Sequence, residues 1–196
     1  MTDVADPPKC RLGRPRSEAV DAAIESAVLE LLVDEGYGGV TMEGVAARAG
    51  VGKASLYRRW PTKEQLVIAA VLHRCEEDRA TPDTGSLRSD VVAYCTRVVA
   101  KLRRHGAILR AVNAETARHP ALAESFRAAF VEQRRAEVRD VLARAVDRGE
   151  LPPGADLELL GDLGPALLWH RLTVTGAPLG DDLPERIAAL IAPAHR

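Results

Sequence analysis

Cationic, hydroxyl and aromatic side chains are concentrated between residues 41 and 63, on segments with the dimensions of two short helices. The first segment runs from Thr41 to Ala49 and the second from Lys53 to Trp60, with a glycine-containing turn between them. Two short helices joined in this way are typical of a helix-turn-helix, whose second helix lies in the major groove of DNA with its first residues at the base edges. The chemistry that these residues could do is therefore recognition of a nucleic acid.

Individual positions in this unit fit different parts of a DNA duplex. Thr41 and Lys63 stand at predicted helix N-termini, where backbone N–H groups and positive charge favour phosphates. A basic tail that includes Arg14 and Arg16 could follow an adjacent groove as an arm. From spacing alone, a three-helix bundle with merely solvated basic residues is a second interpretation. The candidate DNA contacts are Arg14, Arg16, Thr41, Lys53, Ala54, Ser55, Tyr57, Arg58 and Lys63.

The net charge of the chain, −1, would by itself argue against a nucleic-acid-binding protein. Charge along the first third is, however, separated into blocks. Residues 9–16 hold four bases and no acid, residues 17–43 hold seven acids and no base, and residues 44–63 hold five bases and no acid. The average therefore conceals two basic patches on either side of an acidic segment.

Composition favours an all-α protein. Of the 196 residues, 46% are hydrophobic but only 4% are aromatic, and good helix formers dominate. Three well-separated cysteines, Cys10, Cys75 and Cys95, form neither a disulfide framework nor a Cys-x-x-Cys site, so we expect a reducing cytoplasm. The first residues lack the apolar core of a secretory signal, and no stretch approaches 18 uninterrupted apolar residues, so we expect neither export nor a membrane span.

Apolar spacing predicts about nine helices in two groups. Ser17 and Thr62 fit N-caps, Gly36 fits a helix end, and Gly164 with Pro165 should interrupt the eighth helix. We therefore expect a flexible basic arm at 1–16, a helix-turn-helix domain at 17–79 that includes a linking fourth helix, and a helical domain at 86–196. The predicted helices cover residues 17–35, 41–49, 53–60, 63–79, 86–104, 107–118, 120–148, 156–173 and 181–190.

Several segments of the N-terminal third match one known pattern. They are Gly13-Arg14-Pro15-Arg16, Gly36-Tyr37, Val40-Thr41 and the run from Val45 to Glu64. Together they resemble the DNA-binding domain of the TetR/AcrR family of bacterial transcriptional regulators, over residues 13 to about 72. The resemblance implies an all-α, usually homodimeric repressor that releases DNA when a small molecule enters its C-terminal domain. It also implies that Thr41, Tyr57 and Lys63 contact phosphates, and that Lys53 and Ser55 face the groove.

Residues 86–196 are similar to one of the family's common ligand-domain types, for example at Pro120-Ala121-Leu122-Ala123. Semi-polar and aromatic residues at inward-looking positions could line a small-molecule cavity. Each of them also fits simple core packing. The candidates are Tyr94, Val98, Leu102, Leu109, Asn113, Phe126, Phe130, Trp169, His170 and Thr173.

The last two predicted helices carry broad apolar faces. The resemblance implies that these helices form a four-helix interface between two subunits, and Gly161 and Gly164 would allow close approach. An intrachain core fits the same spacing. The candidate interface residues are Leu160, Gly164, Leu167, Leu168, Ile187, Leu190 and Ile191.

Catalytic and metal-binding motifs are missing from the sequence. It holds no Gly-x-Ser-x-Gly elbow, Walker loop or His-Glu-x-x-His, and His105, His119 and His170 lack helical ligand pairing. We expect no enzymatic activity, no cofactor and no metal, and as partners operator DNA, a small-molecule effector and a second copy of the chain, but no membrane. A competing interpretation is an effector-binding protein that acts through protein contacts, which the intact basic positions disfavour. The sequence is also compatible with a transcriptional activator, because the position of the operator relative to the promoter decides whether a bound regulator represses or activates.

Overall fold

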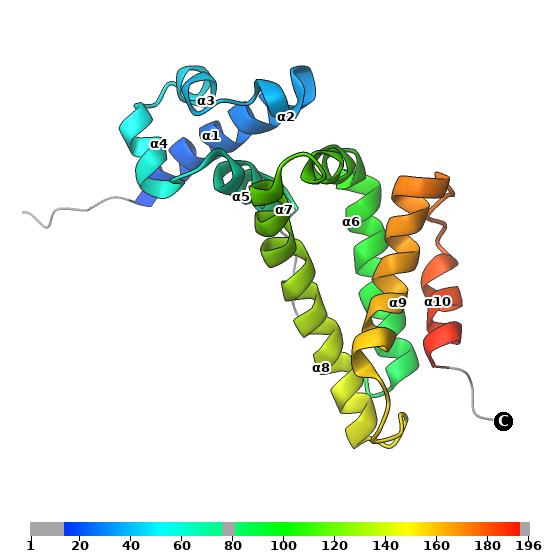
Figure 1. Ribbon diagram of the computed structural model, residues 1–196. Coiled ribbons are helices and arrows are strands. Elements are labelled where there is room, and N and C mark those ends of the chain that lie inside the picture. Colours follow the sequence, from blue (N-terminus) through cyan, green and yellow to red (C-terminus); the bar gives the residue numbers. More distant parts are fainter. Residues whose placement is uncertain (1–13, 76–80, 193–196) are drawn as a thin grey trace, which may run out of the picture.

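The structure is a computed structural model that describes residues 14–75 and 81–192, without the side chains of residues 14–18. Within these ranges every regular element is a helix, which confirms the all-α fold class. Counting each π turn with the helices that it joins, the described residues form nine helical segments. They make an N-terminal body, α1 to α5, and a larger C-terminal body, α6 to α10 (Figure 1).

The N-terminal body is built around α1 (Arg14–Asp34), which packs against α3 (Met42–Ala49) and α5 (Lys63–Arg74). The short α2 (Gly36–Gly39) and α4 (Lys53–Arg59) complete it. Ile24, Val45 and Leu56, from three different helices, are fully buried between them. Burying such side chains contributes roughly 1.5–3 kcal/mol each, so the shared apolar core fixes the relative positions of the short helices.

Two boundaries of this body differ from expectation. The helix α1 already begins at Arg14, so Ser17 lies inside it and is not its N-cap. Residues 14–16 thus belong to a helix and not to an arm, while the rest of the expected arm lies outside the described residues. The linking helix α5 ends at Arg74, and the expected continuation to residue 79 falls largely on residues that are not described.

The C-terminal body begins with α6 (Leu87–Thr116), a single helix of 30 residues. The expected break near residue 105 is therefore wrong. A Cβ atom at Gly106 would lie 2.8 Å from Cδ1 of Leu172, so this glycine permits a close helix contact without ending the helix. Figure 1 shows α9 and α10 beside α6, with α10 on the outer edge.

The remaining helices are α7 (Pro120–Phe126), α8 (Gln133–Asp147), α9 (Leu157–His170) and α10 (Leu183–Ile191). A π turn at residues 127–132 joins α7 to α8 without a break, and a second at residues 171–175 extends α9. Pro165 lies within α9 without interrupting it, against expectation. No helix in the described part of the chain is long and apolar enough to cross a membrane.

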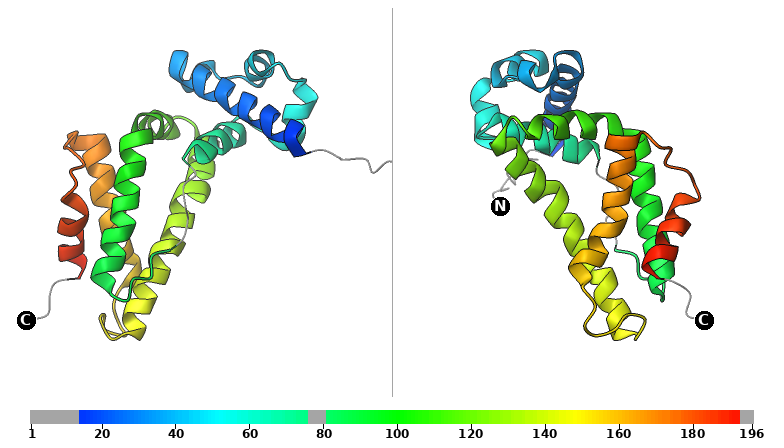
Figure 2. Two further views of the ribbon diagram at one scale, coloured as in Figure 1. Left: turned by 180° about the vertical axis from the view of Figure 1, so that it is seen from behind. Right: turned by 45° about the vertical axis from the view of Figure 1, so that its right-hand side comes forward.

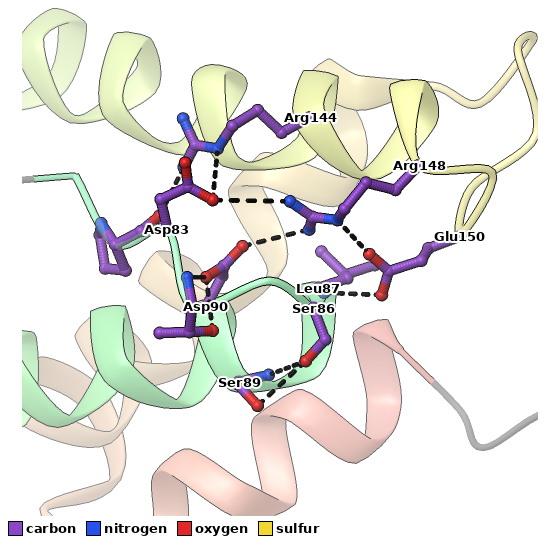
Figure 3. A network of polar contacts seen from close by, with 10 residues as sticks. Asp83, Ser86, Leu87, Ser89, Asp90, Arg144, Arg148 and Glu150 are labelled. Atoms are coloured by element: carbon purple, nitrogen blue, oxygen red, sulfur yellow. Dashed lines mark hydrogen bonds and ion pairs between the residues drawn. The ribbon is translucent and has the colours of Figure 1, made fainter.

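A buried carboxylate fixes the base of the C-terminal body (Figure 3). Asp90 is fully buried, accepts hydrogen bonds from the Thr84 backbone N–H at 2.6 Å and its hydroxyl at 2.7 Å, and pairs with Arg148 at 3.2 Å. The Glu150 carboxylate accepts from the Leu87 backbone N–H at 2.7 Å. These bonds join the start of α6, the preceding loop and the end of α8, so the network sets the angle between the two long helices.

The two bodies touch through a small set of helices. Helix α5 packs against α7 and the π turn that follows it (Figure 2), and α2 also contacts α6. The α7 helix is thus placed between the linking helix and the rest of the C-terminal body.

Candidate functional site

The helix-turn-helix geometry expected from the sequence is present. Gly50 ends α3 in the left-handed conformation, with φ of +66°, and the Val51 N–H bonds the Ala46 carbonyl at 3.0 Å. Only glycine adopts that conformation at little cost. Leu56 is fully buried on the inner side of α4. The turn and this anchor together hold one side of α4 against the core and leave the other open.

The open side of α4 carries most of the predicted groove-facing residues. Lys53, Ala54, Tyr57 and Arg58 are exposed, and 45% of Tyr57 is accessible despite its size. Ser55 is half-buried. An exposed aromatic side chain beside cations suits contact with a phosphate backbone better than core packing.

The basic side chains between residues 44 and 63 differ in how firmly they are paired with acids, and so in how readily they could bind a phosphate. Arg48 pairs with Asp34 of α1 at 3.4 Å, and Arg59 pairs with Asp21 of the same helix. The acids of α1 therefore balance these two bases. Lys53 pairs with Glu43 at 3.3 Å, but both side chains are more than half exposed, so the pair is weak and a phosphate can replace the carboxylate.

The N-termini of α3 and α5 are capped by threonines as predicted. The Thr41 hydroxyl accepts from the Gly44 N–H at 3.0 Å, and the Thr62 hydroxyl accepts from the Gln65 N–H at 3.2 Å. Thr41 is exposed, so it borders the same outer surface as α4. The two helix ends present backbone N–H groups of the kind that bind phosphates.

Lys63 is less free than the sequence suggested. Its ammonium lies 4.0 Å from the centre of the Tyr37 ring, and partial burial lowers its pKa. The hydroxyl of the buried Tyr37 donates a hydrogen bond to Glu64 at 2.8 Å. Burial, first of all, and this bond to the carboxylate raise the pKa of Tyr37. Lys63 thus combines a position at the start of α5 with a fixed ring contact. Arg14 and Arg16 lie in the first turn of α1, and their side chains fall outside the description.

A cavity of about 350 Å³ lies between α6, the α7–α8 segment and α9. Its size is within the range of small-molecule sites, roughly 300–1,000 Å³. The predicted ligand residues found in its lining are Tyr94, Val98, Leu102, Asn113, Phe126, Phe130 and Trp169.

Three predicted ligand residues are not in the lining. Leu109 is a fully buried core residue, whereas His170 and Thr173 are exposed. Trp169 of α9 lines the cavity, and in the π turn that follows α9 the Thr173 hydroxyl donates to the Trp169 carbonyl at 2.8 Å. Leu109, His170 and Thr173 therefore lie outside the cavity wall.

Charged residues of the cavity wall were missed in the sequence. Arg127, Arg134, Arg135 and Asp162 all border it. Arg135 pairs with Asp162 at 3.2 Å. The signal that could have found the arginines is their position on the same helical segment. Arg127 directly follows Phe126, and Arg134 and Arg135 follow Phe130 by four and five residues.

The expected subunit interface separates into buried and exposed residues. Gly164, Leu168, Ile187 and Ile191 are buried within the chain itself, as the alternative of an intrachain core predicts. Leu160 is half-buried. Gly164 packs beside Cys95 and Ile187, and Leu168 lines the cavity.

Leu167 and Leu190 do lie on the surface, 38% and 68% exposed. The sequence did not single out Leu159 and Leu163, which are 63% and 37% exposed on the same side of α9. Large exposed leucines one or two turns apart form an apolar stripe, which is uncommon on a surface that stays in water.

Two family models match the chain. The model described as "Bacterial regulatory proteins, tetR family" matches residues 24–70, and "Tetracyclin repressor-like, C-terminal domain" matches residues 81–191. The first match contains the helix-turn-helix, and the second spans the helices around the cavity.

Curated relatives agree with both matches. An uncharacterized HTH-type transcriptional regulator of Mycobacterium tuberculosis is 36% identical over 157 residues, which are 80% of this chain and 78% of the relative. The DNA-binding transcriptional repressor TetR of Mycobacteroides abscessus is 32% identical over 192 residues, 92% and 98% of the two chains. The crystal structure of the TetR family transcription regulator SCO0332 has a TM-score of 0.71 and 31% identity, and covers 90% of this chain and 99% of that one.

Proposed function

Because the chain belongs to the TetR family of bacterial DNA-binding transcriptional regulators, we propose that it is a homodimeric repressor that a small-molecule effector releases from its operator. The observation that carries this proposal is that one short helix touches both functional parts. Helix α7 packs against the linking helix α5 and also contributes Ala123 and Phe126 to the cavity wall.

The DNA-binding part of the proposal rests on the exposed side of α4. Lys53 and Ser55 would read base edges, while Thr41, Tyr57 and Lys63 would hold phosphates. Arg58, which is exposed and has no acidic partner among the described residues, would add to the phosphate contacts. Because such regulators act on chromosomal operators, we expect the protein to work in the cytoplasm.

The dimer part rests on the exposed leucines of α9 and α10. Leu159, Leu163 and Leu167 follow one another at helical spacing on α9, and Leu190 lies on α10. Pairing these helices with their copies in a second subunit would remove the apolar stripe from water. Two recognition helices would then be carried on one rigid assembly.

The release part follows from the position of α7. Two recognition helices can bind neighbouring half-sites only when they are about 34–36 Å apart. An effector that filled the cavity would displace Phe126 and α7, move α5 with them, and change that distance. The effector must bind the form that does not fit DNA more tightly, since otherwise no shift occurs. Repression is favoured over activation because the Mycobacteroides abscessus relative is described as a repressor.

The proposal is tested by selecting duplexes from a random pool with the purified protein, and then placing a selected duplex in a reporter promoter. We expect enrichment of a two-fold symmetric sequence, repression of the reporter, and relief of repression by a compound that binds the cavity. If no duplex is enriched at moderate salt, the protein acts through other partners. If binding raises transcription, the repressor assignment is wrong.

A further inference from the structure

We propose that the cavity binds an amphipathic acid, with its carboxylate held by Arg134 and the Tyr94 hydroxyl and its apolar body among the aromatic side chains. This inference rests on the proposed function only in taking the cavity as the effector site. It adds the chemical class of the molecule, which the fold alone leaves open.

The Tyr94 hydroxyl is a polar group without a partner. The side chain is only 5% exposed, lines the cavity, and its hydroxyl oxygen has no hydrogen-bond partner among the described residues. Buried tyrosine hydroxyls are normally hydrogen-bonded, because leaving one unpaired has a clear free-energy cost. An acceptor atom on a bound molecule would provide the missing partner.

Arg134 is the second polar group of this wall. Its guanidinium carbon lies 5.7 Å from the centre of the Phe130 ring, and no carboxylate among the described residues pairs with it. Its neighbour Arg135 is engaged by Asp162 at 3.2 Å. Arg134 therefore keeps a positive charge beside the cavity, where a carboxylate can neutralise it with charge-assisted hydrogen bonds.

The two groups act on the same region of space. Burial raises the pKa of Tyr94 to about 12, so the hydroxyl keeps its proton and is a donor at neutral pH. The charge of Arg134 lowers this pKa and the charge of Glu137 raises it. The Glu137 carboxylate is already paired with Arg97 at 3.4 Å. The balance left at this end of the cavity is two donors and one uncompensated positive charge.

Most of the remaining wall is apolar. Its other polar residues are Asn113, Thr116, the exposed Arg127 and the paired Arg135 and Asp162. Phe126 and Phe130 are stacked, with centroids 4.9 Å apart and planes 25° apart, and the Trp169 ring lies 6.3 Å from Phe126. Val98 and Leu102 of α6 face them across the cavity. A neutral apolar molecule would fill this part but leave Tyr94 unpaired, and an amine would be repelled by Arg134.

The test uses three probes with one body: 1-naphthaleneacetic acid, its methyl ester, and 2-(1-naphthyl)ethylamine. The chain has two tryptophans, Trp60 and Trp169, so in a Trp60→Phe background the fluorescence of Trp169 reports binding inside the cavity. We expect the acid to bind at least about tenfold more tightly than the ester or the amine.

Variants assign the preference to the two residues. Arg134→Gln should reduce the acid-over-ester preference by about tenfold while changing ester affinity less than about twofold. Tyr94→Phe should weaken binding of the acid more than binding of the ester, because the ester carbonyl is an uncharged acceptor. Arg139→Gln, an exposed α8 arginine outside the cavity wall, should behave like the parent. Equal binding of acid and ester, an equal loss of both in Arg134→Gln, or no binding of the acid would each overturn the inference.

Measuring acid binding and duplex release on the same samples distinguishes a failure of this inference from a failure of the proposed function. Tight acid binding that does not release a selected duplex would contradict effector release while leaving the ligand class standing. Release of the duplex by a neutral compound, with no binding of the acid, would leave effector release standing and contradict the ligand class.

Discussion

The ring of Tyr37 lies against the imidazole of His119, with centroids 4.7 Å apart and planes inclined by 57°. Tyr37 belongs to the DNA-binding body, where it also contacts Lys63 and Glu64. His119 immediately precedes α7 in the C-terminal body, and its Nε2 atom lies 3.7 Å from Oε2 of Glu115. One buried aromatic ring therefore joins the start of the linking helix to the helix that borders the cavity.

Removing the imidazole should loosen this junction locally. In His119→Ala we expect amide hydrogens of α2 and the first turn of α5 to exchange faster, corresponding to a loss of roughly 0.5–1.5 kcal/mol in local stability. Hydrogen-exchange mass spectrometry measures this directly. His170→Ala, which removes an exposed histidine from α9, is the matched control. Unchanged exchange at α2 would show that the ring contact does not couple the bodies.

The carboxylate that Tyr37 binds predicts a dependence of stability on pH. Burial alone would raise the pKa of Glu64. Hydrogen bonds from its own backbone N–H, from Tyr37 and from Thr62, together with the charge of Lys63, outweigh burial, so the pKa of Glu64 is lowered. A lowered pKa in the folded state means that the ionised form stabilises the fold. This contribution is present above the unfolded pKa of about 4.3 and is lost as the pH falls through the folded value.

Urea unfolding of the wild type and Glu64→Gln checks that sign. The stability difference between them should be largest near neutral pH and shrink as the pH is lowered below about 4.3. A difference that stays constant or grows in acid would mean that the Glu64 charge does not stabilise the folded state.

The buried Asp90 predicts a large effect on stability. Asp90→Ala leaves the Arg148 guanidinium without one of its carboxylates and removes the acceptor of two Thr84 bonds. Breaking a buried pair from one side costs about 3–5 kcal/mol. Asp182→Ala, which removes an exposed pair with Arg186, should cost less than about 1 kcal/mol in the same chemical denaturation experiment. Equal effects of the two changes would contradict a structural role for the network.

The exposed leucines predict the oligomeric state. Leu159→Asp places a charge in the proposed subunit interface, so it should convert dimers to monomers and weaken duplex binding by at least about tenfold. Val33→Asp introduces the same charge at a residue of α1 that is 73% exposed and should leave the dimer intact. Sedimentation velocity separates the two outcomes. A Leu159→Asp protein that remained dimeric would exclude this stripe as the interface.

The helix-turn-helix could be predicted because its signals are local. The Thr41 and Thr62 hydroxyls accept hydrogen bonds from backbone N–H groups three residues ahead. Gly50 adopts the positive φ with which α3 ends and the turn begins. Such contacts depend on neighbours in the sequence, so residue type and spacing are enough to identify them.

The errors in the C-terminal body come from contacts between distant residues. The sequence predicts a break between residues 104 and 107, yet Gly106 lies inside α6 and contacts Leu172, 66 positions away. Leu168 and Ile187 have the same apolar character as Leu167 and Leu190, and only the packing of α9 and α10 on α6 decides which of them face water. The position of Arg134 one turn after Phe130 is a local signal, but only the packing of distant helices places this arginine at a cavity.

The most direct test of the account is whether Lys53 helps to choose between DNA sequences. Fluorescence anisotropy should give the affinities of the wild type, Lys53→Ala and Arg139→Ala for a selected duplex and for a scrambled duplex of the same composition. We predict that the wild type and Arg139→Ala strongly prefer the selected duplex, and that Lys53→Ala loses about 1–3 kcal/mol of that preference. If all three proteins bind both duplexes alike, α4 does not read DNA and the account is wrong.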